Sequence, residues 1–359
     1  MTRSNLPIIE GPVCPVPLHH QTHIVMGHGS GGRMTQELIE RVFLPHFSNP
    51  ALLAGNDFAC ILPASVDTKS AKLVVSTDSH VVSPLFFPGG DIGRLAVCGT
   101  VNDVSMSGAI PSGLTAGFII EEGFPIESLE KVVKSMAAAA AEAGVVIVAG
   151  DTKVVEKGKA DGLFITTTGF GWVSEATSIG GEQAQSGDVV IISGTIGDHG
   201  IAVLAARGDL GFETQVKSDV APLNGLIQAV LKAVPEIHVL RDPTRGGLAT
   251  TLNEIAAQSS VNITIDETSV PYLPAVRTAC EMLGFDPLYV ANEGKVIVIA
   301  PQTHAASIIE IMKEHPYGID AAVIGTVNKT PAKRVLLNTQ IGSTRILDVL
   351  AGEMLPRIC

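Results

Sequence analysis

The chain has 359 residues, of which 46% are apolar, 17% charged and 4% aromatic, which is the composition of a folded globular protein and excludes a disordered one. Its formal net charge is −12, which argues against a nucleic-acid partner, because proteins that bind the phosphate backbone carry a basic face. Five scattered cysteines without a C-x-x-C pair predict neither a disulfide framework nor a zinc site, and no apolar run is long enough to span a membrane. We therefore expect a cytoplasmic protein with no membrane partner.

The length exceeds what one compact core usually holds, and the patterning divides the chain into four segments. Residues 1–22 are rich in proline and histidine and indicate a mobile N-terminal arm. Residues 23–176 and 177–337 are predicted as two domains, because a polar, glycine-containing stretch interrupts the pattern between them. Residues 338–359 lose the alternation and are predicted as a flexible tail.

Within both domains, segments with strand patterns alternate with segments of helical periodicity. In the first domain we expect strands at 72–78, 114–120, 145–149 and 163–170, and helices at 93–103 and 128–144. In the second we expect strands at 188–193, 261–265, 295–300, 321–327 and 334–337, and helices at 198–207, 222–234, 246–258, 274–283 and 303–313. This order predicts an α/β (α+β) fold with one sheet per domain.

Three aspartates stand at strand ends or in a helical segment, each beside small or apolar residues. They are Asp78 in STDSH, Asp103 in GTVNDV and Asp151 in AGDTK. A buried carboxylate is costly unless it is paired or binds a cation, and Mg²⁺ prefers oxygen ligands beside substrate phosphates. A lone aspartate of this kind is more often a cap or turn residue, but three in such similar settings favour a metal site.

Two glycine-rich segments, residues 27–32 and 241–247, come directly before helical patterns. Backbone N–H groups at such a junction, together with the helix dipole, form a cradle for phosphate. Neither segment fits the P-loop or the dinucleotide-binding pattern. With Lys153 and Arg245 as cations, the pattern is compatible with a nucleoside triphosphate site, in which His28 is the better histidine for a phosphate contact.

Two further residues are candidates for chemistry. Glu293, in the segment ANEGK, could be a general base if it is partly desolvated, although an exposed turn is the simpler alternative. Cys359 is the final residue of the sequence, and such a cysteine is usually incidental. A thiol at the end of a long mobile tether nevertheless suggests a use. These residues alone do not name a reaction.

Nine segments together resemble the HypE family of hydrogenase-maturation enzymes, within the superfamily of aminoimidazole ribonucleotide synthetase and selenophosphate synthetase. They follow one another from Gly27 to Cys359, and the final PRIC is highly specific. The segments are HGSGG, STDS, PLFFPGGDIG, GTVNDVSMSGAIP, GDTKVV, SGTIGDHG, RDPTRGG, ANEGK and PRIC.

The resemblance implies a two-domain aminoimidazole ribonucleotide synthetase-like fold, with the N-terminal sheets of two subunits pairing into a barrel and ATP in the resulting cleft. It also implies a reaction. The carbamoyltransferase HypF loads a carbamoyl group onto Cys359, and ATP with Mg²⁺ then drives its dehydration to a thiocyanate. The cyano group passes to iron on the HypC–HypD complex, for [NiFe]-hydrogenase.

On the matching positions, the resemblance together with the residue chemistry assigns three groups of residues. The catalytic residues are Cys359, Glu293 as the base and Lys153 assisting it. The metal ligands are Asp78, Asp103 and Asp151. The nucleotide contacts are His28, Gly29, Ser30, Gly31, Asn102, Thr152, Lys153 and Arg245.

The sequence departs from the family pattern at His80, where an aromatic is expected, and at Ser83, where aspartate is common. We expect His80 to be structural. Alternatives are a selenophosphate synthetase, for which Cys14 lies too far upstream of the glycine loop, and a thiamin-phosphate kinase-like enzyme, which has no use for Cys359. A binding scaffold with a vestigial ATP site is a third, and the intact Asp, Lys and glycine-rich positions argue against it.

Overall fold

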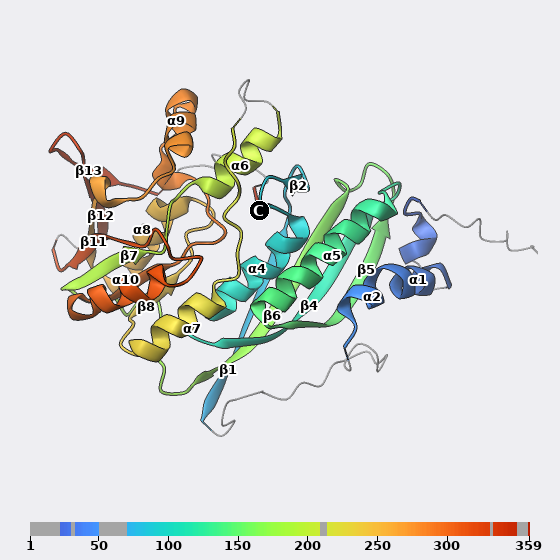
Figure 1. The fold of residues 1–359 in the computed structure, drawn as a ribbon, viewed down its shortest axis with the longest axis horizontal. Helices are drawn as coiled ribbons and strands as arrows, with labels where there is room; N and C mark the ends of the chain where they lie inside the picture. The colour runs from blue at the N-terminus through green and yellow to red at the C-terminus, as the bar shows by residue number, and fades with distance from the viewer. Residues whose placement is uncertain (1–21, 30–32, 50–69, 209–213, 331–332, 350–357) are drawn as a thin grey trace, which may run out of the picture.

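The computed structural model describes residues 22–29, 33–49, 70–208, 214–330, 333–349 and 358–359. It contains two main sheets, each carrying helices, which lie side by side in Figure 1. The predicted mixture of helices and strands is confirmed, and the two main sheets are formed by residues 71–174 and 188–347. None of the described helices is both long enough and apolar enough to cross a membrane.

The first sheet has four strands in the order β1–β6–β4–β5. Its strands are β1 (Ala71–His80), β4 (Ile110–Glu121), β5 (Val146–Val155) and β6 (Leu163–Ser174). β1 and β4 run antiparallel to β6, whereas β5 runs parallel to β4. The described strands do not close into a barrel, so β1 and β5 are open edges.

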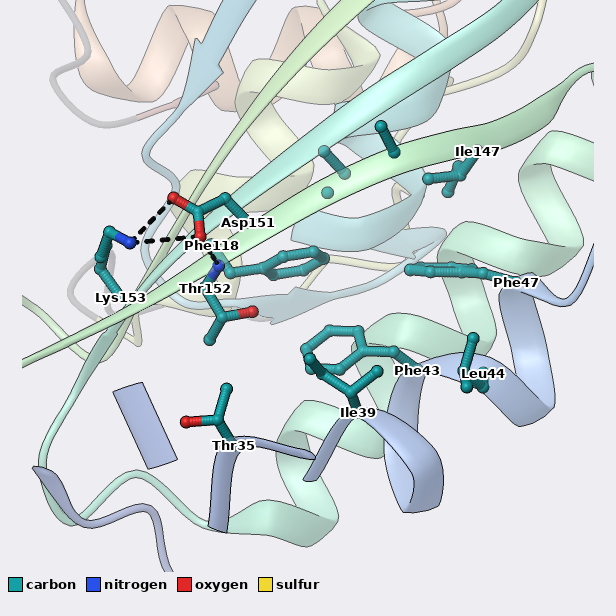
Figure 2. A pocket seen from close by; sticks show the side chains of 13 residues that line it. Thr35, Ile39, Phe43, Leu44, Phe47, Phe118, Ile147, Asp151, Thr152 and Lys153 are labelled. Carbon is teal, nitrogen blue, oxygen red and sulfur yellow. Dashed lines mark hydrogen bonds and ion pairs between the residues drawn. The ribbon is translucent and has the colours of Figure 1, made fainter. Parts of the chain in front are cut away.

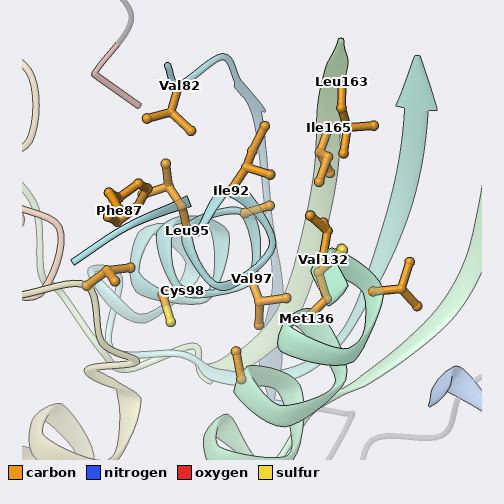
Figure 3. Packing of buried hydrophobic residues seen from close by; sticks show 14 of the residues in the cluster. Val82, Phe87, Ile92, Leu95, Val97, Cys98, Val132, Met136, Leu163 and Ile165 are labelled. Carbon is orange, nitrogen blue, oxygen red and sulfur yellow. The ribbon is translucent and has the colours of Figure 1, made fainter. Parts of the chain in front are cut away.

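Helices α4 (Ile92–Ser105) and α5 (Ile126–Ala143) pack together and cover one face of this sheet. Asp91 begins α4, because its Oδ1 accepts hydrogen bonds from the N–H groups of Gly93 at 2.7 Å and Arg94 at 3.0 Å. Gly144 ends α5 in the left-handed conformation at φ 70°, as the sequence predicts. Figure 3 shows the core that results, in which Leu95, Val97 and Met136 of the two helices pack against strand residues.

The other face of the four-stranded sheet carries exposed apolar side chains. Leu73 and Val75 on β1 are 54% and 58% exposed, and Ile119 and Val146 are 42% and 45% exposed. We call this surface the open face. Apolar groups of this size gathered on one face are typical of a surface that another protein covers.

Near β5, a set of short helices follows the start of the described chain. They are η1 (Met26–Gly29), α1 (Arg33–Leu38), η2 (Ile39–Phe43) and α2 (Leu44–Phe47). A short hairpin of β2 (Phe86–Phe87) and β3 (Gly90–Asp91) precedes α4.

The second sheet has seven strands in the order β13–β12–β9–β11–β7–β10–β8. They are β7 (Asp188–Ile192), β8 (Val239–Arg241), β9 (Asn262–Asp266), β10 (Ile297–Pro301), β11 (Ala322–Asn328), β12 (Arg334–Asn338) and β13 (Thr344–Leu347). Its helices are α6 (Asp198–Ala206), α7 (Asn224–Ala233), α8 (Gly247–Ser259), α9 (Pro274–Leu283) and α10 (Ala305–Lys313).

The structure extends the second unit beyond residue 337, where the sequence predicts the tail to begin. After β12 the chain turns, with the Thr339 N–H donating to the Ser343 oxygen at 2.8 Å, and β13 then pairs antiparallel with β12. Of the predicted tail, residues 338–349 and 358–359 are described, and those that follow β13 are 348–349 and 358–359. The predicted arm, residues 1–22, lies outside the described residues except for Thr22.

Candidate active site

Four carboxyl groups from both structural units meet beside the first sheet. Asp78 lies on β1, Asp103 on α4, Asp242 follows β8, and Glu293 lies in the loop before β10. The charges of the first three all act on Glu293, which shows that the four groups are neighbours. We call this set the acidic cluster. Three of its members are predicted site residues, and Asp242 is an addition.

Burial and repulsion from neighbouring carboxylates raise the pKa values of Asp103, Asp242 and Glu293. Burial raises the pKa of Asp103, with a smaller contribution from Asp78, while the Ser76 hydroxyl donates to Asp103 Oδ2 at 2.8 Å and opposes the shift. Burial and then the Asp103 carboxylate raise the pKa of Asp242 to about 7. Neighbouring carboxyl groups cannot all ionise at once without a counter-charge, so such a cluster favours the binding of a cation.

The surroundings of Glu293 disfavour the charged form of its carboxyl group. Its side chain is buried, only 5% exposed, and its Oε1 has no hydrogen-bond partner in the described structure. Burial, followed by repulsion from Asp219 and Asp242, raises its pKa well above the ordinary value for glutamate. An acid held in this state takes up a proton readily, as a general base must. The alternative of an exposed turn is therefore wrong.

The Asp219 side chain fixes the loop that carries Glu293 through hydrogen bonds to the loop backbone. The Asp219 carboxylate accepts the N–H groups of Glu293 at 3.1 Å and Gly294 at 3.3 Å, and it pairs with Lys295 Nζ at 3.2 Å. A Cβ on Gly294 would lie 1.8 Å from the Asp219 backbone oxygen, so only glycine permits this approach. The position of the base is thus fixed by contacts that do not involve its own side chain.

Cys359 lies against the acidic cluster. The Val81 N–H donates to the Cys359 backbone oxygen at 3.2 Å, and the Ile358 side chain before it is buried in the main core. Burial raises the pKa of the Cys359 thiol, and Glu293 adds to the shift, while Arg245 opposes it. In Figure 1 the C-terminus lies beside β2, between α6 and α4. The structure therefore brings Cys359 together with Glu293.

Arg245 supplies the cation at this site. Its positive charge opposes the rise in the pKa of the Cys359 thiol, and its Nη2 lies 4.0 Å from Asp78 Oδ1. The helix α8 that follows is preceded by Gly246 at φ 76°, and a Cβ there would approach Thr250 Oγ1 to 2.3 Å. The guanidinium is thus placed between the thiol and a carboxylate.

A second group of predicted residues lines a pocket of about 190 Å³ beside β5 (Figure 2). Asp151, Thr152 and Lys153 lie at one end of it, and Thr35 comes from the segment that follows the glycine-rich loop. Most of the remaining lining is apolar and includes Ile39, Phe43, Leu44, Phe47, Phe118 and Ile147. Lys153 Nζ pairs with Asp151 at 3.1 and 3.2 Å.

The first sheet separates Asp151 and Lys153 from the acidic cluster. In the register across the sheet, Asp78 aligns with Thr167, Ala116 and Gly150, so three strand spacings, about 14 Å, lie between β1 and β5. Asp78 points to the α4 side, whereas Asp151 and Lys153 pair with Gly117 and Ile119, whose face is the open face. Within one subunit, Asp151 and Lys153 do not join Asp78 or Cys359.

The remaining predicted nucleotide contacts are placed as follows. His28, in η1, is buried, and its Nδ1 accepts the Val25 N–H at 3.0 Å. Asn102 is buried between the two units, donating to Ala221 and Glu293 backbone oxygens and accepting the Leu223 N–H at 2.7 Å. Gly29 ends η1. Ser30 and Gly31 lie outside the described residues.

His80 is buried beside the cluster, as expected for a structural residue. Its Nε2 lies 3.9 Å from Asp78 Oδ2, and burial lowers its pKa to about 4. Among the described residues, no group of three or more His, Cys, Asp or Glu side chains is arranged to hold a metal by itself. Mg²⁺ is commonly held by one or two carboxylates with phosphate oxygens completing its shell, and Asp78 and Asp103 suit that role.

Three residues near the site were not predicted, namely Asp242 and Asp219, described above, and His199 on α6, whose Nε2 lies 2.7 Å from the Ile358 backbone oxygen. Asp242 stands in the second glycine-rich segment, which was interpreted only as a phosphate cradle. Asp219 and His199 carry no motif signal of their own, although His199 lies inside the family-like segment SGTIGDHG. All three act through contacts between segments distant in sequence.

Comparison with known families supports the two-unit division. Residues 55–173 match the family model of the AIR synthase related protein, N-terminal domain, and residues 185–338 match that of its C-terminal domain. The gap between the matches, residues 174–184, covers most of the connection from β6 to β7.

Two curated relatives are similar over nearly the whole chain. Carbamoyl dehydratase HypE of Azotobacter vinelandii is 54% identical over 336 residues, which is 94% of this chain and 97% of the relative. Carbamoyl dehydratase HypE of Escherichia coli K12 is 46% identical over 337 residues, covering 94% and 99%.

Solved structures agree. A hydrogenase maturation protein HypE in complex with ATP aligns with a TM-score of 0.89 at 49% identity, covering 93% of this chain and 99% of that one. The structure of a HypE–HypF complex aligns with a TM-score of 0.75 at 52% identity, covering 89% and 100%. The chain therefore belongs to the HypE family of hydrogenase-maturation carbamoyl dehydratases, within the AIR synthase related proteins.

Proposed function

We propose that the chain is an ATP-dependent dehydratase that converts an S-carbamoyl group on its own Cys359 into a thiocyanate. The observation that carries the proposal is the position of Cys359 against Glu293 and Arg245. The ATP complex of a 49% identical HypE supports the cosubstrate, and the names of the relatives support the dehydration.

The chemistry balances in two steps. The carbamoyl oxygen attacks the γ-phosphorus of ATP, and ADP leaves while one N–H proton is lost. Loss of the second N–H proton then forms the carbon–nitrogen triple bond as the C–O bond breaks and inorganic phosphate departs. An amide oxygen is a poor leaving group, so phosphorylation removes the main barrier, and the oxygen of the lost water ends in phosphate.

The described residues fit these steps. Glu293, with its raised pKa and free Oε1, is placed to take a proton from the carbamoyl nitrogen. Arg245 lies where it can offset negative charge on the transferring phosphoryl group. Because the substrate is attached to the chain, docking of Cys359 makes the reaction intramolecular, which removes much of the entropic barrier.

The acidic cluster fits a divalent cation. Asp78 and Asp103 would hold Mg²⁺, with Asp242 close by, since these carboxyl groups repel one another without a counter-charge. Bound there, Mg²⁺ neutralises charge on the phosphate oxygens of ATP.

We further propose that the enzyme is a homodimer in which the open faces of two sheets pair into a barrel. The exposed Leu73, Val75, Ile119 and Val146, together with the open edges β1 and β5, support this arrangement. Asp151 and Lys153 lie on the face that the partner would cover. They would therefore serve the acidic cluster of the opposite subunit, Asp151 as a metal ligand and Lys153 beside the thiocarbamate.

Mixed dimers test this division of the site. Asp78→Asn and Lys153→Ala homodimers should each lose most activity, whereas a mixed dimer of the two chains should regain about half of the wild-type turnover, because one of its two sites combines the two intact residues. Mass spectra should show thiocyanate on the Lys153→Ala chain only. An inactive mixed dimer would mean that Asp78 and Lys153 serve the same subunit's site.

We propose that HypF supplies the carbamoyl group and that the HypC–HypD complex accepts the cyano group. A HypE–HypF complex of 52% identity supports the first partner. The docked thiol supports a loading step away from this site, since burial raises its pKa and a protonated thiol is a poor nucleophile.

The proposed reaction is tested by intact-protein mass spectrometry with fragmentation of the C-terminal peptide. After incubation with HypF and carbamoyl phosphate, we expect a carbamoyl group on Cys359, and after Mg-ATP is added, the loss of one water from it. An unmodified Cys359, under conditions in which the E. coli HypE is modified, would contradict the proposal and point to a diffusible substrate.

A further inference from the structure

Hydrogen bonds to backbone oxygens, as well as side-chain packing, hold the last two residues of the chain in the site. Besides the Val81 hydrogen bond, His199 Nε2 lies 2.7 Å from the backbone oxygen of Ile358. His199 is on the first turn of α6 and is fully buried, with an exposed fraction of 0%. The Phe87 ring lies perpendicular to the His199 ring at a centroid distance of 5.5 Å, and Phe87 belongs to the same core cluster as the buried Ile358 side chain.

The hydrogen bonds around His199 determine which ring nitrogen carries the proton. The Ile358 oxygen can only accept, so Nε2 must donate. On the other side, Nδ1 lies 2.8 Å from Ser218 Oγ, and that oxygen already accepts the Val220 N–H at 3.1 Å. The Ser218 hydroxyl therefore has its own proton free to donate to Nδ1. Burial lowers the pKa of His199, which favours a neutral ring with a single N–H.

The same turn of α6 is tied to the loop that carries Glu293. The Gly200 N–H donates to the Ala291 oxygen at 3.1 Å, and the Gly197 N–H donates to Asn292 Oδ1 at 2.7 Å. The first turn of α6 therefore contacts the tail through His199 and also contacts the loop that carries Glu293. A change at His199 alters the tail without removing any group that touches the thiol.

We propose that His199 is a positioning residue that docks the C-terminal tail, through donation from Nε2 to the Ile358 oxygen, so that Cys359 is presented to Glu293. The effect of this docking on catalysis depends on the proposed function. The docking itself does not depend on it, because the contacts are present in the unmodified chain.

Two substitutions separate hydrogen bonding from packing. In His199→Gln the amide N–H₂ lies near the position of Nε2 and can still donate to Ile358, whereas the side chain of His199→Asn is too short to do so. Both remove the ring. The measurement is the alkylation rate of Cys359 by iodoacetamide, site-resolved by mass spectrometry, in the full chain without ATP or HypF. The buried Cys280 serves as an internal reference.

A docked thiol reacts slowly, so the alkylation rate reports the undocked fraction. We expect His199→Asn to raise the Cys359 rate about tenfold, because a buried carbonyl loses its donor, while the Cys280 rate stays unchanged. His199→Gln should remain within about threefold of the wild type. A Cys359 rate in His199→Asn equal to that of the wild type, or equal acceleration in both variants, would overturn the proposal.

A measurement on the wild-type chain covers the case in which a variant does not fold. Long-range ¹H–¹⁵N spectra of histidine-labelled protein report which ring nitrogen is protonated. Protonation of Nε2 at His199 is expected, and a ring protonated at Nδ1 alone would overturn the proposal. Neither measurement requires turnover. With pre-carbamoylated protein and Mg-ATP, His199→Asn should also slow dehydration about tenfold and His199→Gln should not. If no variant and no wild-type protein formed thiocyanate, the proposed function would fail while the docking role stood.

Discussion

Replacement of Cys359 by alanine is expected to abolish thiocyanate formation completely while leaving ATP binding intact. The carbamoyl group has no other attachment point in the proposed reaction, and the acidic cluster and Arg245 do not need the thiol to hold their positions, since Arg245 also lies 4.0 Å from Asp78. The loss is checked by mass spectrometry of the C-terminal peptide after incubation with HypF, carbamoyl phosphate and Mg-ATP. ATP binding is measured by calorimetry.

The matched control is Cys280→Ala. Cys280 is a free, buried cysteine on α9, so its loss tests whether any thiol of the chain matters. We expect thiocyanate at the wild-type level per folded molecule, with some loss of thermal stability from the smaller side chain. Thiocyanate formed by Cys359→Ala would remove Cys359 from the reaction.

Glu293→Gln is expected to lower the dehydration rate by about 10²- to 10⁴-fold, the usual contribution of a general base. Glutamine keeps the size of the side chain and cannot take up a proton. Loading by HypF should be unaffected, so S-carbamoyl protein should accumulate when ATP is present. Single-turnover mass spectrometry of pre-carbamoylated protein measures the rate. Glu127→Gln is the control, since Glu127 is exposed on α5 and pairs with Lys131, and it should react at the wild-type rate.

The pH dependence should change with the same substitution. Burial and neighbouring carboxylates raise the pKa of Glu293, and a base acts only when it is deprotonated. The dehydration rate should therefore rise with pH through a pKa above the ordinary glutamate value and level off beyond it. In Glu293→Gln that rise should disappear. A Glu293→Gln variant that keeps both the rate and the pH profile would exclude Glu293 as the base.

The fold was largely predictable because its elements have strong periodicity. The helix at 274–283 and the stop at Gly144 agree with the structure, since apolar spacing and left-handed glycine are local signals. The strands β8 and β13 were missed. They have only three and four residues, too few to establish a period, and their pairing depends on partners elsewhere in the chain.

The site was predictable in part. Asp78, Asp103, Arg245, Glu293 and Cys359 were identified from their motifs, and the structure brings them together. The separation of Asp151 and Lys153 was not predictable, because it depends on which face of β5 they occupy. That face is determined by the pairing with β4, which carries an irregularity between Leu114 and Thr115. A shift of one residue would reverse it.

The attachment of the substrate to the chain has a kinetic consequence. For an ordinary enzyme, the rate rises with substrate concentration and saturates. Here the carbamoyl group reaches Glu293 only through the docking of the chain's own Ile358 and Cys359, so the step is first order and independent of enzyme concentration. Each chain makes one thiocyanate per loading. In the cell, the rate at which cyano groups are supplied would then depend on the number of chains and on how often each tail moves between the loading partner and the accepting partner.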